Sequence, residues 1–270
     1  MAQVKALVIT GYGTNCEMEM AYACKLAGAQ ADIAHISEVL SGHYLINDYH
    51  FLNLPGGFLD GDDLGSAQVE SVRLKYARVK TTGRTLFEEI ATFIDNGMLI
   101  LGVCNGFQAL VKSGILPGNP LGVRRVSLTF NDSAKFEDRW VGLRVNPASP
   151  CIFTRGMDRI SVPVRHGEGK FVCDSDATLE EITRGNLVAV WYANGEGSPT
   201  QEYPANPNGS VSAIAGICNT TGRIFGLMPH PEAYTHRTNH PAWTRTAGLP
   251  ERGEGMAIFE NAVSFLKGIL

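Results

Sequence analysis

A cysteine at position 104 lies between two glycines in the segment GVCNG (102–106). The apolar run 98–103 before it predicts a buried strand, and the pattern of residues 105–112 predicts a helix. A sharp turn from strand to helix lifts a side chain out of the sheet, and flanking glycines relieve crowding there. Free N–H groups at the start of the helix favour a thiolate, and the N–H after the cysteine faces a developing oxyanion. This layout predicts a nucleophilic thiol, although a cysteine buried at a tight turn has the same local pattern.

A histidine and a glutamate in the segment MPHPE (228–232) are suited to assist such a thiol. A strand pattern ends at His230, and Glu232 follows two residues later. In an extended segment these two side chains project to the same side, and the two prolines favour extended backbone. The imidazole would then act as base and the carboxylate would orient it, as in a Cys-His-Glu triad. On its own this segment is typical of a surface turn, and only its pairing with Cys104 favours catalysis.

A third segment, LPGGF (54–58), also follows an apolar strand. Glycine leaves the backbone N–H groups unobstructed, which suits one half of an oxyanion hole, although a plain turn would have the same sequence. All three segments fall where expected parallel strands end, and open α/β sheets build their sites at that edge.

The elements that would position these segments alternate along the chain. We expect short strands at residues 4–10, 31–36, 50–54, 98–103, 213–217 and 223–228. We expect helices at residues 14–28, 86–96, 105–112 and 256–266. Short apolar strands separated by helices predict an α/β fold with a flavodoxin-like, mostly parallel sheet that has helices on both faces.

The middle of the chain has a different pattern. From residue 121 to about 190, short strands and frequent turns predict added antiparallel strands, for example at 140–145 and 160–164. Two stretches, 194–210 and 235–254, are expected to be loops. The sequence has no internal repeat or low-complexity tract, so we predict a single domain over residues 1–270.

Composition excludes several classes of protein. The 270 residues are 44% hydrophobic and 19% charged, with a formal net charge of -4, which is ordinary for a globular protein and disfavours nucleic-acid binding. No apolar run approaches the ~18 residues of a membrane span, and the N-terminal residues lack a signal-peptide pattern. The six cysteines have no CxxC spacing, and we expect most of them to be small buried residues. We therefore expect a cytoplasmic protein.

The segments GVCNGFQ, PGGF and MPHPE together resemble class I, triad-type glutamine amidotransferases. Further segments narrow the resemblance to the glutaminase components of phosphoribosylformylglycinamidine synthase: GTNC (13–16), LPGGFLDGD (54–62), PVRHGEG (163–169), NPNGS (206–210) and IAGI (214–217). The stretch 131–141 and the loop after Glu232 are more similar to the fused glutaminase domain of the large single-chain enzyme. This chain has no synthetase portion, so it resembles a separate subunit.

The resemblance implies a reaction and a set of partners. The chain would hydrolyse L-glutamine through a cysteine thioester and supply ammonia to a separate ATP-dependent synthetase subunit in purine biosynthesis. A further small subunit is a candidate third component. No metal or cofactor is implied for this chain, and ATP and Mg²⁺ are expected on the synthetase partner.

The resemblance also implies residue roles. Cys104 would be the nucleophile, His230 the base and Glu232 the residue that orients it. The N–H groups of Gly57 and Asn105 would form the oxyanion hole.

Substrate contacts are implied at two further places. Gln108 lies four residues after the nucleophile, where the family contacts glutamine, although an exposed helix residue is the alternative interpretation. The loop 166–169 matches a segment that lines the same pocket, which makes Gly167 and Glu168 candidate substrate-binding residues.

Other ligand sites have weaker support. His230, His236 and His240 could suggest zinc, but prolines and a loop-like composition separate them. The pattern GYGTNC (11–16) lacks the third glycine of a dinucleotide fingerprint, and the sequence has no GxxxxGK[ST] phosphate loop. The aspartates near residue 60 favour a solvated turn over a Mg²⁺ site.

Two rival functions remain open at this stage. A different cysteine-elbow hydrolase, such as an intracellular peptidase, would lack the segments PVRHGEG and NPNGS and would not release ammonia from glutamine. A non-catalytic binding module would be expected to have lost a member of the Cys104, His230 and Glu232 set, which is intact. A glutaminase assay with and without a partner separates these possibilities.

Overall fold

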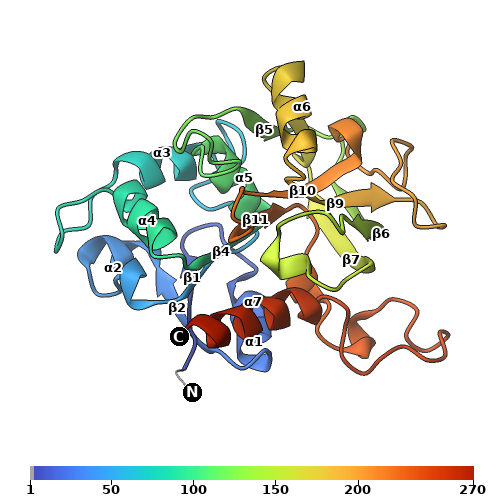
Figure 1. Ribbon diagram of the computed structural model, residues 1–270, viewed down its shortest axis with the longest axis horizontal. Helices are drawn as coiled ribbons and strands as arrows, with labels where there is room; N and C mark the ends of the chain where they lie inside the picture. The colour runs from blue at the N-terminus through green and yellow to red at the C-terminus, as the bar shows by residue number, and fades with distance from the viewer. Residues whose placement is uncertain (1–2) are drawn as a thin grey trace.

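The computed structural model describes residues 3–270 and contains a nine-stranded central sheet (Figure 1). Its strands are β1 (Lys5–Thr10), β2 (Gln30–His35), β3 (Phe51–Leu54), β4 (Leu99–Val103), β6 (Glu137–Val145), β7 (Arg159–His166), β9 (Val188–Ala193), β10 (Ile214–Cys218) and β11 (Ile224–Leu227). They are ordered β2-β1-β3-β4-β11-β10-β9-β6-β7. The pairs from β2 to β11 are parallel, and the pairs from β11 to β7 are antiparallel. A separate antiparallel pair joins β5 (Val126–Thr129) to β8 (Lys170–Cys173).

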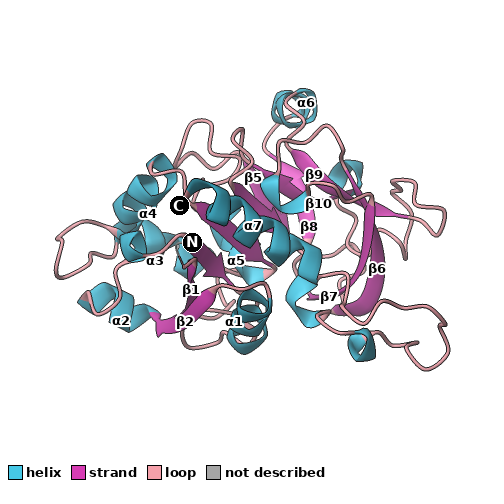
Figure 2. Ribbon diagram, turned by 60° about the horizontal axis from the view of Figure 1, so that its bottom comes forward, coloured by secondary structure: helices cyan, strands magenta, loops and turns pink. Residues whose placement is uncertain are grey.

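Helices cover both faces of the parallel part of the sheet (Figure 2). The helices are α1 (Glu17–Leu26), α2 (Ile36–Ser41), α3 (Gln68–Tyr76), α4 (Leu86–Asp95), α5 (Asn105–Lys112), α6 (Asp176–Arg184) and α7 (Met256–Ile269). Short 3₁₀ turns are η1 (Ile46–Asp48), η2 (Ile152–Thr154), η3 (Val211–Ala213), η4 (Pro231–Ala233) and η5 (Arg237–Asn239). Helix α1 packs beside α7, and α3 packs against both α4 and α5.

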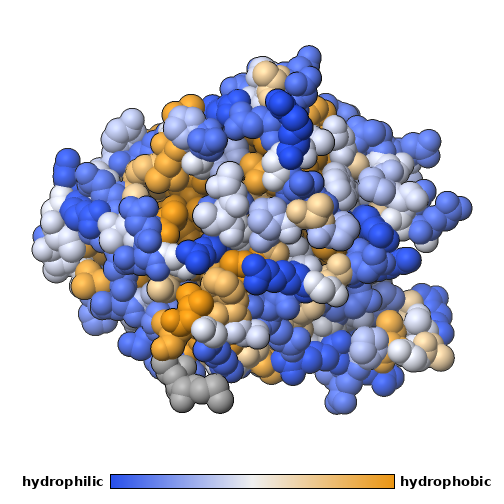
Figure 3. Space-filling model, viewed as in Figure 1, coloured by the Kyte–Doolittle hydropathy of each residue, from blue (hydrophilic) through white to orange (hydrophobic). Residues whose placement is uncertain are grey.

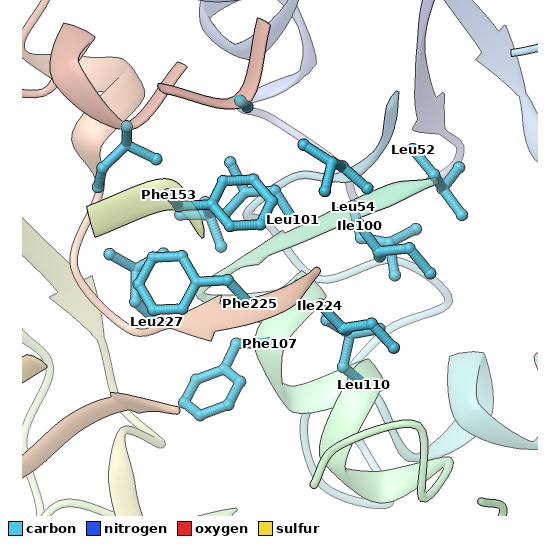
Figure 4. Packing of buried hydrophobic residues seen from close by; sticks show 14 of the residues in the cluster. Leu52, Leu54, Ile100, Leu101, Phe107, Leu110, Phe153, Ile224, Phe225 and Leu227 are labelled. Carbon is cyan, nitrogen blue, oxygen red and sulfur yellow. The ribbon is translucent and has the colours of Figure 1, made fainter. Parts of the chain in front are cut away.

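The hydrophobic core lies around β4 and β11, at the centre of the sheet. All residues of these two strands are buried, as expected for parallel strands covered on both faces. Phe107 and Leu110 of α5 pack on one side of the strands (Figure 4). Phe153 of η2 packs on the other side against Phe225, with the ring centroids 5.6 Å apart. This packing holds the C-terminal ends of β4 and β11 in fixed positions.

The predicted fold class is confirmed, including the antiparallel strands added to a parallel sheet. The bounds of α5 agree with the prediction, and the expected strands are found within a few residues. The first helix begins at Glu17 rather than at Thr14, because the N–H groups of Asn15 and Cys16 both donate to the carbonyl of Gly56 (3.3 Å each). These bonds hold the preceding residues in a turn.

Three helices were not predicted: α2, α3 and α6. Helix α6 corrects the expectation that the middle of the chain contains only strands and turns. Its N-cap signal is present, since the Ser175 hydroxyl accepts from the N–H of Thr178 (3.3 Å), but few apolar residues follow. Helix α3, by contrast, lacks a clear apolar face, and it buries Glu70 and Ser71 together with Leu74.

Polar side chains cover most of the face in view in Figure 3, and apolar ones gather in small groups between them. Within residues 3–270, none of the helices has both the length and the apolar character needed to cross a bilayer.

Candidate active site

Cys104 lies at the turn between β4 and α5, in a strained backbone conformation. Its φ is 51° and its ψ is -105°, a region that non-glycine residues rarely adopt. The two nearby glycines are required by close packing. A Cβ atom on Gly106 would overlap the carbonyl of Leu54, and one on Gly102 would lie 2.7 Å from the carbonyl oxygen of Gly106. The turn therefore has the geometry expected of a nucleophile elbow.

The Cys104 thiol opens into a pocket with a volume of about 160 Å³. The lining residues are Asn15, Cys16, Gly57, Phe58, Cys104, Phe136, Asp138, Arg165 and His230. Cys104 as a whole residue is only 6% exposed, and its Sγ lies 3.7 Å from the carbonyl oxygen of Arg165. The pocket thus brings three of the predicted site residues together: Cys104, His230 and Gly57.

His230 follows β11, which is the parallel neighbour of β4. Its Nδ1 lies 2.6 Å from Oε1 of Glu232, and both side chains are buried. The predicted contact is present, but its local basis was wrong. Residues Pro231–Ala233 form the 3₁₀ turn η4 rather than extended backbone, and this turn places Glu232 against the imidazole.

The electrostatics of His230 favour its protonated form. Burial by itself would lower the pKa of His230, but the charges of Glu232 and of a Cys104 thiolate raise this pKa well above its usual value. The Nε2 atom of His230 is buried and has no hydrogen-bond partner in residues 3–270. The ring therefore has one nitrogen held by Glu232 and one free for a proton transfer in the pocket.

The predicted oxyanion-hole residues precede and follow Cys104 in the chain, and Gly57 lines the same pocket as Cys104. Gly57 has a φ of 134°, and a Cβ there would lie 2.6 Å from the carbonyl oxygen of Gly13. Only glycine suits that conformation and that approach. Asn105 is the first residue of α5, so its backbone N–H has no partner within the helix. The placement is compatible with an oxyanion hole, which stays a prediction.

Gln108 is buried on α5 instead of exposed. Its Nε2 donates to the backbone carbonyl of Glu168 (2.6 Å), and its Oε1 accepts from the side-chain amide of Asn105 (3.2 Å). The Glu168 carboxylate accepts from the N–H of Ser66 (3.2 Å) and lies 3.7 Å from the ammonium of Lys112. This network connects α5 to the loop 166–169.

The loop residues lie outside the pocket lined by Cys104. Gly167 accepts a hydrogen bond at its carbonyl from the N–H of Asn131 (3.0 Å), and neither Gly167 nor Glu168 belongs to the lining. Gln108 is not part of the lining either. Direct contact of these three residues with substrate stays a prediction, and their observed contacts are with one another and with the protein.

His166 of the same loop is not available as a base. Its Nδ1 lies 3.1 Å from Oδ1 of Asn131, and its Nε2 lies 3.5 Å from Nδ2 of Asn208. Burial, with the charge of His230, lowers the pKa of His166 to about 3. The side chain of Asn208 also donates to the hydroxyl of Tyr192 (3.0 Å). His166 is thus a neutral residue that connects the loop to the segment 206–210.

Cys16 is a pocket residue that the sequence analysis missed. Its Sγ lies 3.9 Å from Nδ1 of His230 and donates to Oδ1 of Asn15 (3.1 Å). Burial raises the pKa of this thiol, which favours its neutral form. The only available signal was its position in the segment GTNC, after the first strand.

Cys16, His230 and Glu232 form the only cluster of three potential metal ligands within residues 3–270. Their donor atoms lie within 4.8 Å of one another, and the donor set would suit Zn²⁺. However, the 2.6 Å contact between His230 and Glu232 already uses Nδ1 and one carboxylate oxygen, which favours acid–base chemistry. His230, His236 and His240, the three histidines considered for zinc, do not form a cluster of potential metal ligands within residues 3–270. The ring of His240 instead packs against the ring of Trp140, with the ring centroids 4.9 Å apart.

Comparisons with known proteins agree with this geometry. The sequence profile of the CobB/CobQ-like glutamine amidotransferase domain matches residues 3–266. Over 271 residues, covering all of both chains, the chain is 44% identical to the phosphoribosylformylglycinamidine synthase subunit PurQ of Dehalococcoides mccartyi. It is 40% identical over 273 residues to the subunit of that name in Methanococcus maripaludis, with 97% of each chain covered.

A solved structure is similar over the same extent. A chain in the structure of PurLQS from Thermotoga maritima superposes with a TM-score of 0.70 at 27% identity, covering 98% of this chain and 100% of that one. The match of the family profile to nearly the whole chain, together with relatives at 40% identity or more, shows that this chain belongs to the CobB/CobQ-like glutamine amidotransferase family.

Proposed function

We propose that this chain is the glutaminase component of phosphoribosylformylglycinamidine synthase. It releases ammonia from L-glutamine and supplies it to a separate synthetase subunit. One observation carries the proposal: Cys104, at its strained turn, and His230, whose imidazole contacts the buried Glu232, line the same pocket. Relatives that match along the full length of the chain are named as that subunit.

In the proposed reaction, the Cys104 thiolate attacks the carboxamide carbon of glutamine. The N–H groups of Gly57 and Asn105 stabilise the oxyanion that forms. Imidazolium Nε2 of His230 gives a proton to the leaving nitrogen, so ammonia departs and a γ-glutamyl thioester remains. The neutral imidazole then takes a proton from water, which attacks the thioester and releases glutamate. Throughout, Glu232 holds Nδ1–H and stabilises the positive charge of the ring.

The synthetase partner is assigned the ATP-dependent chemistry. The Thermotoga maritima structure is named PurLQS, which supports an assembly of this kind of subunit with others. We assign ATP and Mg²⁺ to the partner and no cofactor to this chain, and we include a further small subunit as a third component. The six cysteines are free thiols, which fits a reducing compartment, and we propose a cytoplasmic location.

Reconstitution tests this proposal. The purified chain is combined with the synthetase subunit of the same organism, and glutamate release and amidine formation are measured with glutamine or with an ammonium salt. We expect glutamine to support synthesis only when this chain is present, and ammonium to support synthesis without it. Glutamine-dependent synthesis by the synthetase alone, or an assembled complex that releases no glutamate, would contradict the proposal.

A further inference from the structure

One wall of the pocket comes from β6 and β7 and carries two charged residues of opposite sign, Asp138 and Arg165. These residues are paired directly across the antiparallel ladder. Such partners project from the same face of a sheet, with their Cβ atoms about 4.5–5.5 Å apart. The two side chains do not form an ion pair with each other. Arg165 is paired with Glu19 instead, and Asp138 has no ion-pair partner within residues 3–270.

The backbone of Arg165 lies close to the Cys104 thiol, and the Arg165 side chain forms only one exposed ion pair. Its carbonyl oxygen lies 3.7 Å from Sγ of Cys104. Its guanidinium lies 3.8 Å from the carboxylate of Glu19, and the two side chains are 40% and 43% exposed. Exposed pairs of this kind contribute little stability, so a substrate carboxylate can share or replace Glu19 at small cost.

Asp138 is exposed, and no side-chain hydrogen bond to it is found in the described part of the chain. Apart from His230, Asp138 and Arg165 are the only charged residues of the nine that line the pocket. The other lining residues include Phe58 and Phe136, whose rings offer apolar surface.

L-Glutamine presents groups that match this wall. Its α-carbon carries a carboxylate and an ammonium group side by side, and two methylene groups separate that carbon from the carboxamide. One cation and one anion together, a short distance from the nucleophile, are complementary to both charges of the free amino acid. Charge-assisted hydrogen bonds to both groups would provide that selectivity.

We propose that Arg165 binds the α-carboxylate and Asp138 the α-ammonium group of glutamine. The pair determines specificity, because it admits a free amino acid and disfavours carboxamides that lack either charge. This inference rests on the proposed function and adds to it the residues that recognise the end of the substrate remote from the scissile bond.

Truncated substrates test each contact separately. Ammonia release is measured in the complex with the synthetase subunit, using L-glutamine, 4-aminobutanamide without the carboxylate, and glutaramate without the ammonium group. Arg165→Gln should raise KM for L-glutamine and for glutaramate by about 10- to 100-fold and leave 4-aminobutanamide unchanged. Asp138→Asn should raise KM for L-glutamine and 4-aminobutanamide and leave glutaramate unchanged. Arg165→Lys retains the charge and should recover most of the loss.

A matched control removes charges from the same part of the sheet, away from the pocket. Arg144 of β6 lies 2.9 Å from Asp158, and neither residue lines the pocket. Arg144→Gln and Asp158→Asn should leave KM for all three compounds unchanged.

Two results would overturn the proposal. One is an Arg165→Gln enzyme that loses the same factor with all three compounds, which would mean a general effect on the pocket. The other is an unchanged KM with weaker assembly between the subunits, measured by sedimentation, which would assign the pair to the docking surface. A wild-type complex that releases no ammonia from glutamine would instead contradict the proposed function, so the two failures are distinguishable.

Discussion

The parallel and antiparallel parts of the central sheet contribute to the pocket in different ways. In the parallel part, β3, β4 and β11 end at turns that carry Gly57, Cys104 and His230. In the antiparallel part, β6 and β7 present side chains from a strand face, among them Asp138 and Arg165. Parallel strands end at a common edge, so backbone turns gather there, whereas antiparallel strands offer a continuous face. We infer that the turns supply the chemistry and the face supplies selectivity.

The sharpest test of the parallel part is Cys104→Ser. A hydroxyl is a much poorer nucleophile than a thiolate without a matched base, so glutamine-dependent synthesis should be lost. The size of the side chain is nearly unchanged, so the variant should still assemble with the synthetase subunit and retain synthesis from ammonium. Both nitrogen sources are compared at matched pH, because only unprotonated ammonia reacts.

A matched thiol outside the pocket provides the control for this variant. Cys173 of β8 is half-buried, and Cys173→Ser should keep both activities. Equal loss of synthesis from glutamine and from ammonium in an assembled Cys104→Ser complex would mean that Cys104 serves the synthetase reaction or the structure.

Labelling by a diazo-ketone analogue of glutamine should also map chiefly to Cys104.

His230 and Glu232 should differ in the size of their effects. His230→Ala removes the base and should reduce glutamine turnover by about 10²–10⁴-fold. Glu232→Gln leaves a polar group near Nδ1 but removes the charge that raises the pKa of His230, so turnover should fall by less. Because acylation uses the protonated imidazole, the basic limb of the kcat/KM profile should move to lower pH in Glu232→Gln, following the lowered pKa of His230.

His236→Ala is the control for the histidine variant, because His236 lies in an exposed loop and only caps η5. Full turnover by His230→Ala would show that the segment MPHPE is only a turn.

Close packing at the strand ends predicts a stability difference between the two parts of the sheet. Gly106→Ala would press a Cβ atom against the backbone carbonyl of Leu54, which cannot move without displacing β3. We expect a loss of roughly 1–3 kcal/mol or more in the free energy of unfolding. Gly195 follows β9 in the antiparallel part and has open space around it, so Gly195→Ala should be nearly neutral. Denaturant unfolding of both variants checks this, and equal midpoints would contradict it.

The last test concerns pH and His166, in the antiparallel part of the sheet. His166 has a pKa of about 3 in the folded protein, mainly through burial, against an ordinary value of 6.5. Between these values the unfolded chain binds more protons at this residue. Its contribution to stability is therefore complete above pH 6.5 and is lost as the pH falls toward 3, by about 1.4 kcal/mol per pH unit.

His166→Gln should lower stability at neutral pH and reduce this slope. Unfolding by urea at several pH values between 4 and 7 provides the comparison. An unchanged slope would show that His166 is accessible to protons in the folded state.

Much of this arrangement could be predicted from local sequence. The alternation of apolar strands with helices predicted the parallel part of the sheet, and glycines around position 104 predicted the turn that the structure contains. Helix α3 was missed because it lacks a clear apolar face, and helix α6 was missed because it contains few apolar residues. Short helices of this kind depend on tertiary packing for their stability. The contact between His230 and Glu232 was expected for a local reason that proved wrong, since η4 positions it.

The sequence by itself determined the segments in which a strand leads into a turn, because each of them is local. The glycine spacing around Cys104 and the separation of two residues between His230 and Glu232 depend on neighbouring residues alone. Only the tertiary structure decided which segments share a pocket. Cys16 beside His230, and Asp138 across from Arg165, come from residues far apart in the chain. Their proximity depends on strand order and register, which result from burial of the whole sheet and leave no local pattern.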